Sequence, residues 1–155
     1  MNELSNTVAH GFIHSYRDFA RRVHALSENL SEEQFWTKPY PYGNSFGHLT
    51  LHIIGNLNYY IGTQIANTGY VRDREREFTE ESPPLKEEVS RRLAEAVDLV
   101  EATLETQTAE TWVNAYGAAG AADFVKDRFG IFLSCAAHFH HHIGQMVYLA
   151  KEFSK

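Results

Sequence analysis

Apolar residues recur every three or four positions over four long stretches of the chain. In the first stretch, about residues 4–30, they are Val8, Phe12, Tyr16, Phe19, Val23 and Leu26. This period is typical of an amphipathic helix. The same pattern covers about residues 46–66, 85–104 and 123–153. The pattern therefore predicts four long helices, each with one apolar face.

Helix-ending residues separate these stretches. The four prolines fall in two pairs, Pro39 with Pro41 and Pro83 with Pro84, and prolines seldom sit inside helices. Asn44 or Ser45 can cap the second long helix, and Ser82 the third. Ser31 and Gln34 have the spacing of a capping box, which predicts a short extra helical turn after the first helix.

No segment alternates as a strand would, and no internal repeat or low-complexity tract is visible. Four long helices with short connections predict an all-α fold, an up-down four-helix bundle, in one domain over residues 1–155. Residues 72–92 are crowded with charges of both signs, which predicts a solvated loop followed by an exposed helix face.

Charge and cysteine content narrow the classes of protein. The chain of 155 residues has 14 basic and 20 acidic side chains, a net charge of -6, which argues against binding to nucleic acid or to an anionic membrane. Its single cysteine, Cys135, excludes an intramolecular disulfide and favours a reducing compartment. The N-terminus lacks the features of a signal peptide, and no apolar run has the length of a membrane span. We therefore expect a cytoplasmic protein.

The nine histidines are concentrated on particular helical faces. His138 and His142 are one turn apart, and at about 100° per residue they share the apolar stripe of Ile131, Cys135 and Met146. Two imidazoles facing the bundle interior need polar partners. A shared metal ion would satisfy both, and separate hydrogen bonds to backbone, Tyr or Glu are the alternative.

His48 and His52 form a similar pair on the second predicted helix. His52 lies about 100° from the centre of the apolar stripe and His48 about 140°, so His52 is the better inward candidate and His48 fits the surface or the rim. Together with His138 and His142, His52 would give three nitrogen ligands, the number found in catalytic metal sites. Imidazoles suit Zn, Ni, Cu or Fe(II). No histidine has an acidic residue three positions before it, which argues against a carboxylate-bridged di-iron site.

Other candidates are less specific. His10 and His14 are expected to be exposed or to face a dimer partner, and Cys135 to be a buried inert thiol, with a fourth-ligand or redox role as the alternative. Tyr59, Tyr60 or an acidic residue of the first or third long helix could reach the site as a base. Gln145 is expected to support packing.

Two segments resemble one known family. Residues 45–53, Ser-Phe-Gly-His-Leu-Thr-Leu-His-Ile, resemble the second helix of the DinB-like (damage-inducible protein B) superfamily. Residues 138–145 resemble its C-terminal motif, His-x-x-x-His-Arg-Gly-Gln. Ile143 stands where the family commonly has arginine, and Phe139 where an acidic residue often follows the first motif histidine.

The resemblance implies a four-helix bundle with a metal site formed by His52, His138 and His142. It implies a metal-dependent hydrolase or a transferase that uses a low-molecular-weight thiol, acting on a small-molecule substrate as a homodimer. Zn or Ni is the first expectation for the metal, with Fe or Cu as alternatives. Two other hypotheses are a non-catalytic dimeric bundle, whose metal or histidines are structural or sensory, and a metal-free bundle that carries a small apolar ligand.

Overall fold

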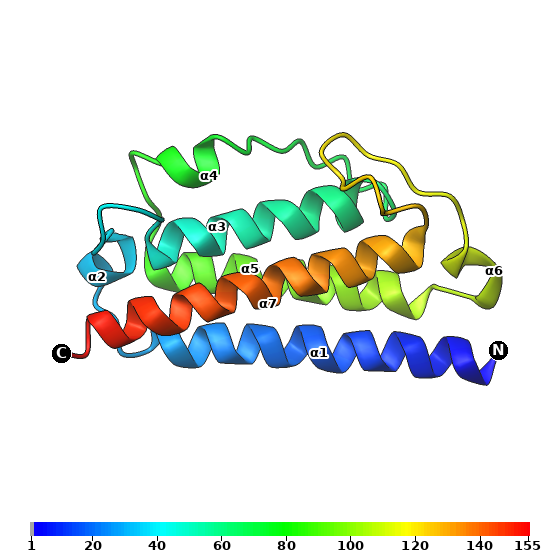
Figure 1. The fold of residues 1–155 in the computed structure, drawn as a ribbon, viewed down its shortest axis with the longest axis horizontal. Helices are drawn as coiled ribbons and strands as arrows, with labels where there is room; N and C mark the ends of the chain where they lie inside the picture. The colour runs from blue at the N-terminus through cyan, green and yellow to red at the C-terminus, as the bar shows by residue number, and fades with distance from the viewer. Residues whose placement is uncertain (1) are drawn as a thin grey trace.

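Four long helices form the body of the molecule in the computed structural model, which describes residues 2–155. They are α1 (Glu3–Ser27), α3 (Phe46–Leu57) with its continuation as a π-helix, η1 (Asn58–Thr63), α5 (Lys86–Glu105) and α7 (Arg128–Glu152) (Figure 1). Short helices α2 (Glu32–Trp36), α4 (Arg76–Thr79) and α6 (Ala109–Trp112) lie in the connections. The described residues contain no β-strand, only one isolated bridge between Ala115 and Asp127. The predicted all-α bundle is confirmed.

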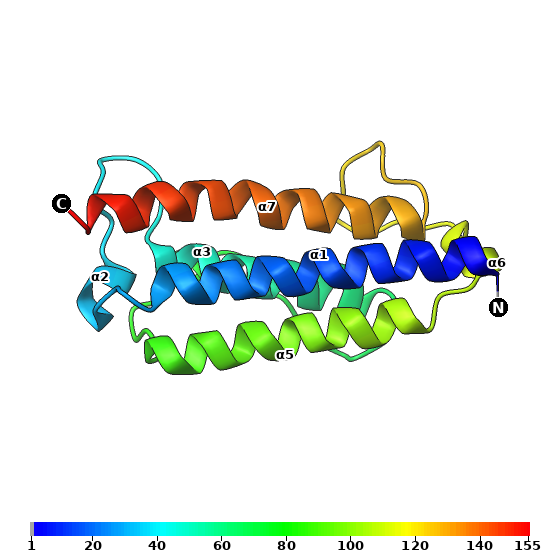
Figure 2. The ribbon, with the colours of Figure 1, turned by 90° about the horizontal axis from the view of Figure 1, so that it is seen from below.

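Each long helix packs against two neighbours. α1 lies between α5 and α7, as Figure 2 shows from below, and α3 packs against the same two helices from the other side. The second and fourth long helices are therefore neighbours, which places His52 and the histidines of α7 on adjoining surfaces.

The helix directions differ from simple up-down alternation. After η1, residues 64–85 run back along the bundle, so that α5 starts at the same end as α3 (Figure 1). We call residues 64–85 the crossover segment. Consequently α1 and α7 run in parallel, with Tyr16 bonded to Phe132, while α1 and α5 run antiparallel, with Arg17 paired to Glu101. An extended chain covers about 3.3 Å per residue, so a segment of this length can span the bundle.

Local signals fix the helix ends. Ser31 and Gln34 form the predicted capping box of α2, and the Ser45 hydroxyl accepts the backbone N–H of His48 at the start of α3. α7 begins at Arg128, later than the apolar pattern suggests, because the Asp127 carboxylate accepts the backbone N–H of Gly130 and sets the cap there.

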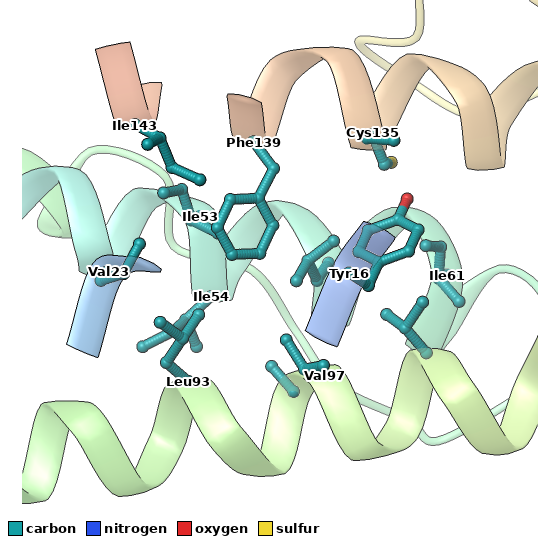
Figure 3. Packing of buried hydrophobic residues seen from close by; sticks show 14 of the residues in the cluster. Tyr16, Val23, Ile53, Ile54, Ile61, Leu93, Val97, Cys135, Phe139 and Ile143 are labelled. Carbon is teal, nitrogen blue, oxygen red and sulfur yellow. The ribbon is translucent and has the colours of Figure 1, made fainter. Parts of the chain in front are cut away.

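The core is a continuous apolar layer between the four helices, shown in part in Figure 3. Tyr16 is buried there beside Phe139, and its hydroxyl donates to the backbone oxygen of Phe132 at 2.7 Å. Trp112 of α6 closes one end and donates from Nε1 to the Ser5 hydroxyl. Among residues 2–155, no helix combines the length and the apolar character needed to cross a membrane.

Candidate metal centre

Three of the predicted histidines meet between α3 and α7. His52 comes from α3, and His138 and His142 lie one turn apart on α7. The Nε2 atom of His138 lies 2.9 Å from Nε2 of His52 and 3.1 Å from Nε2 of His142. The three residues, which we call the histidine cluster, could hold a metal ion.

Hydrogen bonds fix how two of these rings present their Nε2 atoms. His52 Nδ1 lies 2.9 Å from the Glu77 carboxylate, and His142 Nδ1 lies 2.7 Å from Gln145 Oε1. Carboxylate and amide oxygens only accept, so both Nδ1 atoms carry the proton and both Nε2 atoms keep their lone pair in the neutral ring. These two lone pairs face one nitrogen of His138, whose single N–H could serve only one of them.

A cation suits this donor set better than a proton does. Nitrogen ligands about 2.0–2.1 Å from a tetrahedral ion are about 3.3 Å from each other, close to the spacing of the Nε2 atoms. Burial, with help from the other two rings, lowers the pKa of His138 to about 3, and burial also lowers the pKa of His142. His138 and His142 are therefore neutral at pH 7, the form in which imidazole binds a metal.

The Glu77 carboxylate comes from the crossover segment, where the sequence led us to expect solvated charges. Glu77 is buried, and its carboxylate accepts two hydrogen bonds from the guanidinium of Arg72. Nε donates to Oε2 at 2.8 Å, and Nη2 donates to Oε1 at 2.9 Å. The prediction of a solvated loop is wrong for these two residues, because the ion pair gives each buried charge a partner. A carboxylate behind a ligand histidine orients the ring and raises its basicity.

A glycine provides the room for that carboxylate. Gly55 lies on α3 three residues after His52, and a Cβ atom there would overlap the carboxylate of Glu77. A glycine inside a helix often marks a place where another group packs closely. Gly55, close to the candidate ligand His52, was therefore the signal in the sequence that a side chain from elsewhere lies against this helix.

Two other expectations need correction. Gln145 does not merely support packing, since its side-chain oxygen holds the His142 ring. His48 was expected at the surface or rim, yet it is buried, with Nδ1 2.6 Å from the Ser45 hydroxyl and its ring against Trp36. The cause is α2, which brings Trp36 over the start of α3 and covers a helix face that the local pattern leaves open.

The remaining candidates lie outside the histidine cluster. Cys135 is buried, and burial raises the pKa of its thiol to about 12. His10 and His14 are exposed on α1. The Tyr59 hydroxyl donates to the backbone oxygen of Ala119, whereas Tyr60 borders a cavity beside the cluster.

Two cavities adjoin the histidine cluster. The larger has a volume of about 630 Å³ and is bordered by all three cluster histidines. The smaller, about 250 Å³, reaches Asn56, Tyr60 and Cys135. Asn56 is buried, and its Oδ1 atom has no hydrogen-bond partner among the residues described. The cluster is thus open to a small molecule on two sides.

Comparison with known proteins agrees with this arrangement. The model of the DinB superfamily matches residues 16–146, most of the chain, including the three cluster histidines, Glu77 and Gln145. A search of curated proteins finds no match to the chain.

Proposed function

The chain belongs to the DinB superfamily, and from this premise and the geometry of the histidine cluster we propose that it is a metal-dependent enzyme. His52, His138 and His142 would hold one divalent transition metal beside the larger cavity. The observation that carries the proposal is the convergence of three Nε2 atoms from two helices, two of them with Nδ1 fixed by an acceptor.

The reaction class we propose is hydrolysis, or transfer of a group to a low-molecular-weight thiol. When bound, a divalent transition metal supplies Lewis acidity, which makes a water or thiol beside it a stronger nucleophile at neutral pH. Zn or Ni is our first choice of metal, and imidazole ligands also suit Fe and Cu.

The protein's own groups prepare the site for this chemistry. Glu77 and Gln145 hold two rings in the tautomer that leaves Nε2 free. Phe78 lies against the His52 ring, with ring centroids 4.7 Å apart, and shields one side of the cluster. The two cavities give substrate and nucleophile separate routes to the same point.

An open site fits the residues better than a closed structural one. A structural zinc site needs a fourth protein ligand. Among the residues that the structure describes, the cluster contains three donors, because His48 is bonded to Ser45 and Cys135 keeps its proton. Three protein ligands beside a cavity favour the enzyme over a structural or sensory bundle.

Metal analysis of protein purified without a histidine tag tests the proposal. We expect about one equivalent of metal in the wild type, after loading with Zn or Ni. His52→Ala, His138→Ala and His142→Ala should lose most of it, and His24→Ala, an exposed histidine on α1, should not. Full metal content in all three cluster variants would overturn the proposal.

Thermal unfolding distinguishes a metal-binding protein from the metal-free bundle of the alternative hypothesis. Added Zn or Ni should raise the melting temperature of EDTA-treated wild type, since a ligand that binds the folded state stabilises it. A melting temperature that neither EDTA nor metal changes would support a bundle that carries an apolar ligand instead.

A further inference from the structure

The larger cavity beside the histidine cluster is lined by positive charge, although the protein as a whole is acidic. Its lining includes no aspartate or glutamate, and its one fully charged side chain is Arg74. The whole chain carries a net charge of -6. A cavity lined by one sign of charge focuses the field and attracts ions of the opposite sign. This cavity therefore favours a negatively charged ligand, and a bound metal cation would strengthen the preference.

Arg74 stands where the two cavities meet. It borders both of them, and so do His52 and His138. Its guanidinium lies 5.5 Å from the centre of the Phe78 ring, the ring that packs on His52. A ligand group held by Arg74 would therefore lie next to the histidine cluster.

Arg74 is also available to a ligand. Its neighbours in the crossover segment, Arg72 and Arg76, are paired with Glu77 and Glu80. Arg74 has no such ion pair to any acidic residue within 2–155, and it is exposed. A guanidinium without a carboxylate partner keeps its donors for a carboxylate, phosphate or sulfonate of a ligand.

Aromatic rings form the other wall of the larger cavity. Tyr40 and Tyr42 lie almost parallel, with centroids 5.5 Å and planes 13° apart. Tyr148 on α7 borders the same cavity. The residues Tyr42 and Tyr148 are 71% and 69% exposed, so their rings can take up a flat apolar group from water.

We propose that this cavity binds a small organic anion with a flat apolar part. The acid group would bond to Arg74, and the flat part would lie against Tyr40, Tyr42 and Tyr148. The inference names the substrate class of the same site and rests on the proposed function for its reactivity, while binding itself depends on groups outside the metal ligands.

A matched pair of probes tests the acid group. Calorimetry on the full chain, metal-loaded and EDTA-treated, would compare 2-naphthoate with the neutral 2-naphthamide. We expect naphthoate to bind about tenfold more tightly, the effect of one charge-assisted hydrogen bond. Arg74→Gln should abolish this preference. Arg91→Gln should retain it, because Arg91 lies on α5 and pairs with Glu88 and Glu95. Tyr42→Ala should weaken both probes by a similar factor.

The test of the anion site can fail or succeed independently of the proposal that the histidine cluster holds a metal. The EDTA-treated protein keeps Arg74 and the tyrosines, so an Arg74-dependent preference for naphthoate without metal supports the anion site even if metal analysis fails. Equal affinity for the two probes, a preference that survives Arg74→Gln, or no naphthoate binding to either form would overturn the inference.

Discussion

At the scale of single residues, two histidines one turn apart on α3 differ in the groups that hold their rings. His52 and His48 are both buried on α3, but His52 is held by a carboxylate and His48 by a hydroxyl. The rotation argument predicted that His52 faces the bundle, because the angle between residues on a helix is a local property. It failed for the burial of His48, because Trp36 of α2 covers it and that contact depends on how the chain folds back.

Cys135 provides a prediction at this scale. Burial raises the pKa of its thiol to about 12, and the thiolate is the reactive form. At pH 8 the folded protein should react with a thiol reagent such as DTNB far more slowly than free cysteine does. One equivalent should react at once after unfolding in urea.

The raised pKa of Cys135 also makes the stability of the fold depend on pH. A raised pKa means that the folded state resists loss of the proton, so folding becomes less favourable as pH rises from the unfolded value, near 9, towards 12. Rapid labelling of the folded protein at pH 8 would instead support the reactive or ligand role considered for this residue.

At the scale of elements, the crossover segment is both a connection and part of the site. The four amphipathic helices could be predicted, because their apolar period is repeated many times along the chain. No periodic pattern marks Arg72 and Glu77, because their neighbours are charged and their burial depends on meeting α3. Pairing across long sequence separations leaves no period to detect, which is why this half of the site was missed.

The crossover segment yields a prediction about metal affinity. Glu77→Gln keeps an acceptor for His52 Nδ1 but removes the charge that raises the ring's basicity and pairs with Arg72. Loss of such an outer partner costs about 10–100-fold in metal affinity. Competition with a chromophoric chelator would measure it, with Glu80→Gln as the control, because Glu80 pairs with Arg76 in the same segment.

A substitution in α3 tests the contact between Glu77 and that helix. Gly55→Ala should displace the Glu77 carboxylate and weaken metal binding without changing any hydrogen-bonding group. Gly11→Ala on α1, where a Cβ meets nothing within 4 Å, should leave affinity unchanged. Unaltered affinity in both Glu77→Gln and Gly55→Ala would mean that the carboxylate has no part in holding the metal.

At the scale of the whole molecule, the exposed side of α7 lacks the charges of an ordinary surface. Between Arg128 and Lys151 the helix has no aspartate, glutamate, lysine or arginine. Five exposed positions in this range follow one stripe, within about 80° of arc; they are Phe129, Leu133, Ala137, His140 and Gly144. His141, Gln145 and Tyr148 are exposed to one side of this stripe, towards the larger cavity. An uncharged stripe that includes small residues suits close packing of two helices, and we propose a second copy of the chain as the partner.

The dimer prediction is tested by light scattering after size-exclusion chromatography. Wild-type protein should have the mass of two chains at micromolar concentration, and Leu133→Lys should shift it towards one chain, because a buried lysine without a partner is costly. Leu85→Lys, another exposed leucine but far from α7 in sequence, is the matched control. A wild-type mass of one chain would exclude this use of the stripe.

The parallel course of α1 and α7 determines how the molecule would resist mechanical force. The chain ends lie at opposite ends of the long axis (Figure 1). Pulling on them draws α1 one way and its neighbour α7 the other, so the load is spread along the whole interface in shear and does not peel it open turn by turn. The hydrogen bond from Tyr16 to Phe132, near the start of α7, and the packing of Phe19 on Phe139, near its middle, would then resist the sliding of the two helices. The bundle should therefore be stiff when stretched between its own termini.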